Sequence, residues 1–197
     1  MSVIFETTSA TEISPSLVSR CGTIYVDSHS IGWRPHVQSH IAKHSIYDGY
    51  GKVLRALFDW AIDPCLDFLR ENGDTSVDRE LHLVTSILNL FEILLRDACE
   101  DSAEDIGRSN HFVVWAQAAL IQAIAWGLSG NLLEDSQTRF NAFCTSFWSG
   151  ADTRYPKPDA IKHLDVTLPN EGLIQDNFYI FKGPQQYKVQ LHVLETR

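Results

Sequence analysis

The stretch VDRELHLVTSILNLFEILLRDA, residues 77–98, carries the clearest helical pattern in the chain. Its apolar side chains recur every three or four residues and form two neighbouring stripes on one side of a helix. Polar residues, among them Asp78 and Arg96, occupy the other side. Two adjacent stripes make a broad apolar face, which predicts contact with more than one neighbouring helix rather than a strict coiled coil. The stripes are Val77, Leu81, Val84, Leu88, Phe91, Leu95 and Ala98, and Leu83, Ile87, Leu90 and Leu94.

Several other segments show helical spacing of apolar residues, and together they predict a bundle of about five or six helices. A helix over about 53–69 contains Pro64, which should kink or divide it because proline lacks a backbone donor. Residues 112–128 are apolar nearly all round, so we expect a helix buried at the centre of the bundle rather than a membrane span. Further helices are expected to begin at Pro35 and to cover 134–148.

The sequence pattern predicts short strands near both ends of the chain. Residues Thr23–Val26 form an apolar run after the Cys21-Gly22 break. Near the other end, Asn177–Phe181 and Tyr187–Val193 alternate around a Gly-Pro pair, as the two strands of a β-hairpin do. The predicted fold class is therefore mainly α, a helical bundle with short β strands at its N-terminal and C-terminal ends.

The amino-acid composition limits the class to which this protein can belong and the partners that it can bind. The 197 residues are 44% hydrophobic, which is ample for a buried core. The formal net charge of −9 opposes nonspecific binding to nucleic acid or to an anionic membrane surface. The N-terminal residues lack the basic and long apolar regions of a signal peptide. Four widely spaced cysteines, at positions 21, 65, 99 and 144, predict structural thiols in a reducing compartment.

Three imidazoles, those of His36, His40 and His44, fall on one face of the helix that begins at Pro35. Two histidines one turn apart are a known zinc geometry. However, each helical turn rises by about 5.4 Å, so the first and third imidazoles stand too far apart to share one ion. No carboxylate or cysteine lies beside them in the sequence. We therefore expect a solvated polar face and no metal site here, and the alternative is a helical metal protein that uses the His36/His40/His44 face.

Arg20 lies between a short predicted helical turn and the Cys21-Gly22 break, a place where its charge could serve two purposes. A guanidinium at such a corner suits an anionic partner because it is always charged and presents its donors in a rigid fork. The alternative is that the cation only offsets the negative end of the helix dipole.

Motifs along nearly the whole chain decide between these alternatives, because as a set they resemble the second AAA+ module of dynein heavy chains. Ser14-Pro15 with Val18-Ser19-Arg20-Cys21-Gly22, and then Gly32-Trp33-Arg34-Pro35, resemble the family's SPATVSRCG and LGWRP. Further along, FDW…DPCLDF (58–68), GNLLEDSQTRF (130–140) and SG…YPKP (149–158) are similar to family stretches. The same holds for IFE (4–6) and for PxEG (169–172) with the following Phe178-Tyr179.

The resemblance implies a division of the chain and a role for each part. Residues 1–27 would be a remnant of the AAA+ ATPase core, 28–152 the helical lid/extension domain, and 153–197 a linker and β-hairpin leading toward the next AAA+ module. Arg20 falls on the family's arginine finger, which would act in trans on nucleotide bound at the neighbouring module. Trp33, Arg34 and Pro35 would pack the junction between strand and lid, with Arg34 either in an ion pair there or without measurable effect.

The implied parent is a dynein heavy chain, an ATP-driven, minus-end-directed microtubule motor of the cytoplasm and cytoskeleton, and of the cilium and axoneme. Its partners would be adjacent AAA+ modules, dynein intermediate and light chains, and microtubules, with no nucleic acid and no membrane. The sequence shows neither Walker A nor Walker B: Gly49-Tyr50-Gly51-Lys52-Val53 lacks the first glycine and the final hydroxyl of a phosphate loop.

We therefore expect a fragment that is inactive alone. It would bind no cofactor by itself, and ATP with magnesium would occupy the neighbouring module of the parent motor. The alternative is a non-enzymatic helical interaction module derived from a dynein-like segment.

Overall fold

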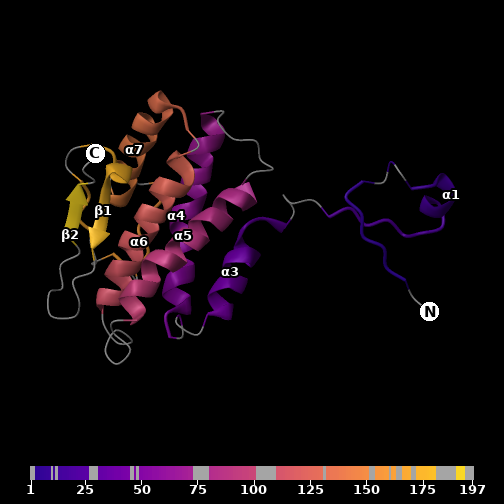
Figure 1. Cartoon of the computed structure of the whole chain (residues 1–197), viewed down its shortest axis with the longest axis horizontal. Helices are drawn as coiled ribbons and strands as arrows, with labels where there is room; N and C mark the ends of the chain where they lie inside the picture. Colours follow the sequence, from indigo (N-terminus) through magenta and orange to yellow (C-terminus); the bar gives the residue numbers. More distant parts are fainter. Residues whose placement is uncertain are drawn as a thin grey trace.

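Helix α6 (Asn110–Ser129) lies at the centre of a helical bundle (Figure 1). It contacts α4 (Gly51–Glu71), α5 (Glu80–Glu100) and α7 (Glu134–Trp148), and it also contacts the C-terminal hairpin. This arrangement comes from a computed structural model, which describes residues 3–9, 11, 13–26, 31–44, 47, 49–72, 80–100, 110–130, 132–150, 154–159, 161–162, 166–169, 172–180 and 190–193.

The central position of α6 follows from its composition. Residues Phe112–Ser129 are long and apolar enough to cross a membrane, but 89% of this window is buried inside the bundle. An α-helix without a polar face can avoid water only if other elements cover it all round. The predicted buried central helix is therefore confirmed.

Helices α5 and α6 approach closely at Gly127. A Cβ atom at this position would lie 3.0 Å from Cγ1 of Ile87, a side chain that is fully buried on α5. The absence of a side chain at Gly127 therefore lets the two helices pack at this distance.

Aromatic side chains join α4 to the helices around it. Phe58 of α4 meets Phe91 of α5 edge-on, with ring centroids 5.1 Å apart. Trp60, two residues further along and so on another side of α4, stacks on Phe147 of α7 at 4.4 Å. Such pairs contribute about 0.5–1.5 kcal/mol beyond the area that they bury, so α4 is fixed against both neighbours.

Three features of α3 and α4 test the expectations drawn from the sequence. Helix α3 (Arg34–Lys43) has Pro35 in its first turn, as predicted. Helix α4 ends at Glu71, close to the expected end, and the side-chain amide of Asn72 donates to the carbonyl of Phe68 at 2.7 Å. Of the kink or division expected at Pro64, the division is wrong: the helix continues through this buried proline to Glu71. Burial of the flanking residues in the core outweighs the one lost backbone hydrogen bond.

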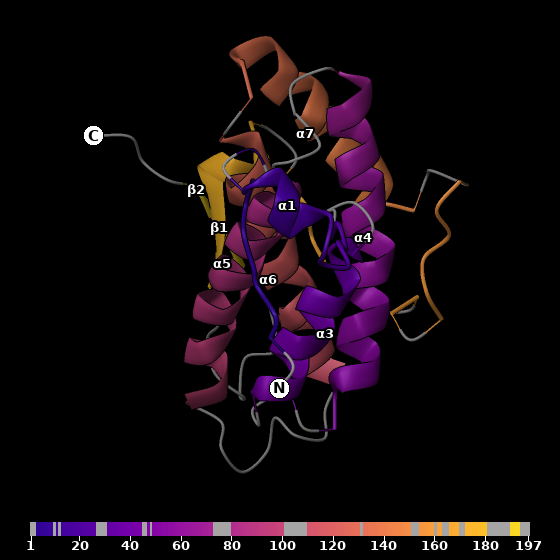
Figure 2. The same ribbon diagram turned by 90° about the vertical axis from the view of Figure 1, so that its right-hand side faces the viewer.

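The C-terminal hairpin packs on the side of the bundle away from the N-terminus (Figures 1 and 2). A short 3-10 helix, η4 (Ile174–Asp176), leads into β1 (Asn177–Ile180), which pairs antiparallel with β2 (Gln190–Val193). The register places Asn177 opposite Val193. The predicted hairpin is confirmed, although Phe181 and Tyr187 lie outside the described residues.

The N-terminal residues 3–26, which we call the N-terminal arm, extend away from the bundle (Figure 1). They include one short helix, α1 (Pro15–Val18). The strand expected at Thr23–Val26 is wrong: these residues form no strand, and Ile24 and Tyr25 are each 86% exposed. An apolar run forms a strand only where a second strand pairs with it, and the helical bundle offers no such partner to this segment among the described residues.

Two of the cysteines in helical segments are buried, as expected for structural thiols: Cys65 in α4 and Cys144 in α7. Burial, and then the neighbouring Cys65, raises the pKa of Cys144, which keeps this thiol protonated and unreactive. Cys21 is exposed in the N-terminal arm, and the side chain of Cys99 lies outside the described residues.

The pairing of Phe91 with Phe58 gives a test of the core. We expect Phe91→Ala to lower the free energy of unfolding by about 3–5 kcal/mol, because it leaves a cavity between α5 and α4. Ile93→Ala, on the same helix but 54% exposed, should change it by no more than about 0.5 kcal/mol. Urea denaturation followed by circular dichroism measures both values, and similar losses in the two variants would contradict the packing described.

Candidate functional site

Arg20 lies just after α1, in a turn that local sequence explains. Pro15 starts the helix, where its missing N–H costs nothing. The backbone N–H of Ser19 donates to the carbonyl of Pro15 at 3.0 Å, and that of Arg20 donates to the carbonyl of Leu17 at 3.1 Å. These bonds close the last turn and leave the Arg20 side chain exposed.

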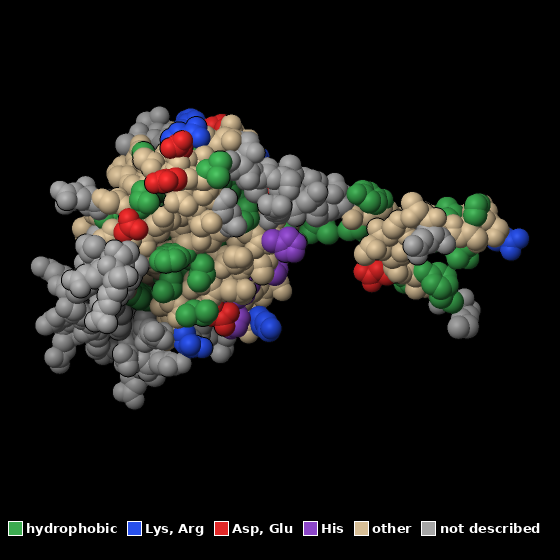
Figure 3. Space-filling view, turned by 45° about the horizontal axis from the view of Figure 1, so that its top comes forward, with side chains coloured by type: hydrophobic (Ala, Val, Ile, Leu, Met, Phe, Trp, Pro, Cys, Tyr) green, Lys and Arg blue, Asp and Glu red, His purple; other side chains and the backbone are tan. Residues whose placement is uncertain are grey.

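The N-terminal arm keeps Arg20 away from the bundle. Figure 3 shows the arm standing out from the body of the molecule with hydrophobic side chains along it. Within the part of the chain that the structure describes, no ion pair involves Arg20. Its guanidinium is therefore accessible to a partner outside the bundle.

The other residues singled out from the sequence, Trp33, Arg34 and Pro35, lie at the start of α3, and the structure does not bring them together with Arg20 (Figure 1). The indole N–H of Trp33, a buried residue, donates to Oδ1 of Asp63 on α4 at 2.9 Å. Pro35 is exposed and shapes the first turn of the helix.

Arg34 pairs with two carboxylates on α4. Its Nε donates to Asp59 at 3.1 Å, and its terminal nitrogen donates to Asp63. The guanidinium also lies over the Trp33 ring, 4.7 Å from its centroid. Partial burial alone would lower the pKa of Arg34, but the hydrogen bond and charge of Asp63, and then Asp59, raise it. Of the two sequence-based alternatives for Arg34, the structure shows the ion pair.

Sequence reasoning did not identify Asp59 and Asp63 as partners at this junction. They stand one helical turn apart on α4, so both face the same side of that helix. A pair of acids at this spacing was the available signal, and only the packing of α3 against α4 shows which cation they meet.

The three histidines, two on α3 and His44 directly after it, divide into a pair and a single residue. Nε2 of His40 and Nε2 of His44 each lie 3.6 Å from the same oxygen, Oε2 of Glu92 on α5. His36 instead lies beside Thr85, with 3.2 Å between its Nε2 and the threonine Oγ1. Burial, followed by the charge of His44, lowers the pKa of His40.

The polar residues on this side of α5 were not linked to the histidines from the sequence, and Glu92 is one of them. The sequence itself carries no signal for this contact, because periodicity separates exposed from buried positions but does not show which exposed positions meet across two helices.

Comparison with known proteins agrees with the motifs in the sequence. A family model described as "Dynein heavy chain AAA lid domain" matches residues 54–188. Dynein axonemal heavy chain 3 of Mus musculus is 30% identical over 192 residues, which cover 93% of this chain and 5% of that protein. Dynein axonemal heavy chain 12 of Mus musculus is 29% identical over 184 residues, which cover 91% of this chain and 6% of the relative.

A more distant relative is the dynein beta chain, flagellar outer arm, of Chlamydomonas reinhardtii, which is 26% identical over 180 residues, covering 90% of this chain and 4% of that protein. The chain therefore spans only 4–6% of the length of these curated relatives. No solved structure gives a significant match.

The junction at Asp63 can be tested by comparing two carboxylates on one helix. We expect Asp63→Ala to lower the free energy of unfolding by about 1–2 kcal/mol, because Trp33 then loses the acceptor for its indole N–H as Arg34 loses a partner. Asp59→Ala removes only an exposed ion pair and should cost at most about 1 kcal/mol. Urea denaturation measures the difference, and a larger loss for Asp59→Ala than for Asp63→Ala would count against this geometry.

Proposed function

The chain belongs to the dynein heavy chain family, and we propose from this that Arg20 acts as an arginine finger for nucleotide bound at a neighbouring AAA+ module. The observation that carries the proposal is the exposure of Arg20 on an arm that projects from the bundle (Figure 3). A residue that acts on a neighbour's nucleotide has to remain accessible outside its own helical domain.

The chemistry of this role suits a guanidinium. During phosphoryl transfer, negative charge spreads over the oxygens of the transferred group, and a fixed cation beside them lowers the barrier. Arginine keeps its charge at any physiological pH and offers several donors in one plane. Arg20 would contribute this charge in trans, so it acts only within an assembled ring of modules.

The helical bundle serves as the lid and extension of its own module in this proposal. Trp33 and Arg34 attach the start of α3 to α4 through Asp59 and Asp63. That attachment fixes the start of α3, the end of the bundle nearest to the N-terminal arm in sequence. Trp33, Arg34 and Pro35 are positioning residues in this role, not catalytic ones.

The wider activity that we propose is that of the complete motor, an ATP-driven, minus-end-directed movement along microtubules. ATP and magnesium would bind at the neighbouring module, and dynein intermediate and light chains would associate with other parts of the heavy chain. The names of the relatives, axonemal heavy chains and a flagellar outer-arm chain, support a location in the axoneme of a cilium.

The finger role is tested in a complete dynein heavy chain that carries this segment. We expect Arg20→Ala to slow ATP hydrolysis at the first AAA+ module by roughly 10³-fold or more, because a lost arginine finger typically costs that much. Arg20→Lys should recover only part of the rate, since lysine keeps the charge but loses the planar fork. Single-turnover hydrolysis, with the other nucleotide sites inactivated, measures each rate.

Arg55→Ala is the matched control, because Arg55 is an exposed arginine on α4 within the bundle. It should leave turnover at the first module unchanged. The proposal fails if Arg20→Ala turns over ATP at the rate of the unaltered motor while nucleotide binding is intact.

A further inference from the structure

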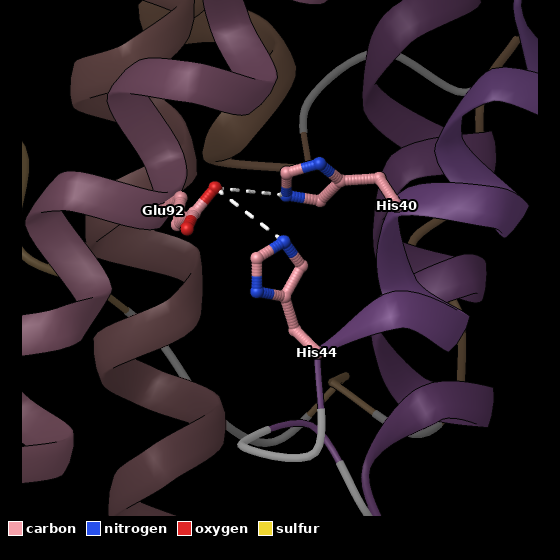
Figure 4. Close-up of side chains that lie close together, drawn as sticks. All are labelled: His40, His44 and Glu92. Carbon is pink, nitrogen blue, oxygen red and sulfur yellow. Dashed lines mark ion pairs between the residues drawn. The ribbon is translucent and has the colours of Figure 1, made fainter.

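The imidazole of His40 on α3, that of His44 directly after this helix, and one carboxylate of α5 converge on a common point (Figure 4). The candidate ligand atoms of His40, His44 and Glu92 all lie within 4.8 Å of one another. In Figure 4 both imidazoles point from α3 toward the Glu92 carboxylate, which reaches across from the facing helix. The arrangement joins two elements that are distant in the sequence.

The contacts within this cluster are too long for hydrogen bonds. Each imidazole Nε2 stays 3.6 Å from Oε2 of Glu92, whereas an N–H···O hydrogen bond brings the two heavy atoms to about 2.7–3.2 Å. Nε2 of His40 is buried and has no hydrogen-bond partner among the described residues. A buried nitrogen aimed at a carboxylate without bonding to it leaves a polar group that an additional atom between them would satisfy.

We propose that His40, His44 and Glu92 bind a divalent transition-metal ion, for which Zn²⁺ is the best match. Two imidazoles one helical turn apart with one carboxylate are a donor set that Zn²⁺ takes in proteins. Zinc bonds to nitrogen and oxygen measure about 2.0–2.2 Å, so the three ligand atoms would draw closer together around the ion. The side chains are 14%, 28% and 40% exposed respectively, which gives an ion a path of entry and leaves a position for water.

The protonation state of the site is compatible with metal binding. Desolvation and the nearby His44 lower the pKa of His40, while Glu92 opposes this shift. The result favours the neutral imidazole near pH 7, the form that coordinates a metal. His36 and Lys43 contribute in the same direction to the pKa of His40, and the Glu92 carboxylate supplies the negative charge that a divalent ion requires.

His36 provides a control within the same helix. It lies one turn before His40 on the same face, but it contacts Thr85 rather than Glu92. A histidine-rich surface that binds metal nonspecifically would depend on His36 as much as on the other two, whereas the proposed site would not.

The test is a zinc titration of the full 197-residue chain at pH 7.5 after removal of bound metal, followed by calorimetry. We expect one zinc ion per chain with an affinity in the micromolar range or tighter, and a rise in the midpoint of thermal unfolding on binding. Co²⁺ in place of zinc should give the visible absorption of a four-coordinate site. Glu92→Gln and His44→Gln should each weaken zinc binding by at least about 10-fold, as loss even of a supporting residue does, and His36→Gln should leave it unchanged.

Absence of heat and of the cobalt absorption at micromolar metal would overturn the proposal. Equal binding by Glu92→Gln and the unaltered chain would do the same, because the ion would then lie elsewhere. Circular dichroism without metal checks that each variant folds. Should a variant unfold, a zinc X-ray absorption spectrum of the unaltered protein decides: two imidazole neighbours with oxygen support the site, and sulfur or a single imidazole refutes it.

Discussion

The whole bundle depends on the need to cover α6 on nearly every side. Because this helix is apolar nearly all round, little of it can be left to water, and Trp126 is its one exposed side chain among those described. Helices α4, α5 and α7 cover part of it, and the segment of η4 and β1 covers more. Gln122 makes the last contact specific: its side-chain amide donates to the carbonyl of Asn177 at 2.8 Å inside the core. A buried amide without this acceptor would be costly, so the hairpin completes the bundle.

Residues that carry the family resemblance meet one another in space, which explains why they occur together. The indole N–H of Trp60 donates to the carbonyl of Tyr155 at 3.0 Å, and the Tyr155 hydroxyl lies 3.2 Å from Oδ2 of Asp67. On α7, Asn141, which directly follows the 130–140 motif, donates its side-chain amide to the carbonyl of Gly172 at 3.4 Å. Two motif segments that follow the bundle in the sequence are thus fixed to α4 and to α7. These contacts belong to the packing of the lid and require no nucleotide.

Helices were largely predictable from the sequence because their apolar periodicity directly reflects which face is buried. Helix α7 occupies the expected residues, with acidic side chains in its first turn, where the helix dipole favours them. Two predictions were wrong. In one, the tendency of proline to break a helix competed with packing, and in the other an expected strand had no second strand to pair with. Pro64 stays inside α4 because its neighbours are buried, and Thr23–Val26 form no strand because a single segment cannot make a sheet.

Residues of the candidate sites could be predicted from the sequence only where a motif within a single segment identifies them. Arg20, Trp33 and Arg34 could be named from motifs, whereas Asp63 and Glu92 depend on how helices pack against each other. A periodic pattern records whether a residue faces water, and it holds no information about which exposed residue of another helix lies opposite.

Helix α3 links the two functional proposals physically. It is short, and its buried side chains are Val37 and Ile41, so apolar packing alone gives it little to resist sliding or turning on the bundle. Polar groups along α3 face two different helices: Trp33 and Arg34 bind α4, whereas His36 lies beside Thr85 of α5. His40 and His44 lie opposite Glu92 of α5, where a metal ion would replace two long contacts with short, directional bonds. In its proposed role, Arg20 would contribute to phosphoryl transfer only when it is held beside the oxygens that gain charge.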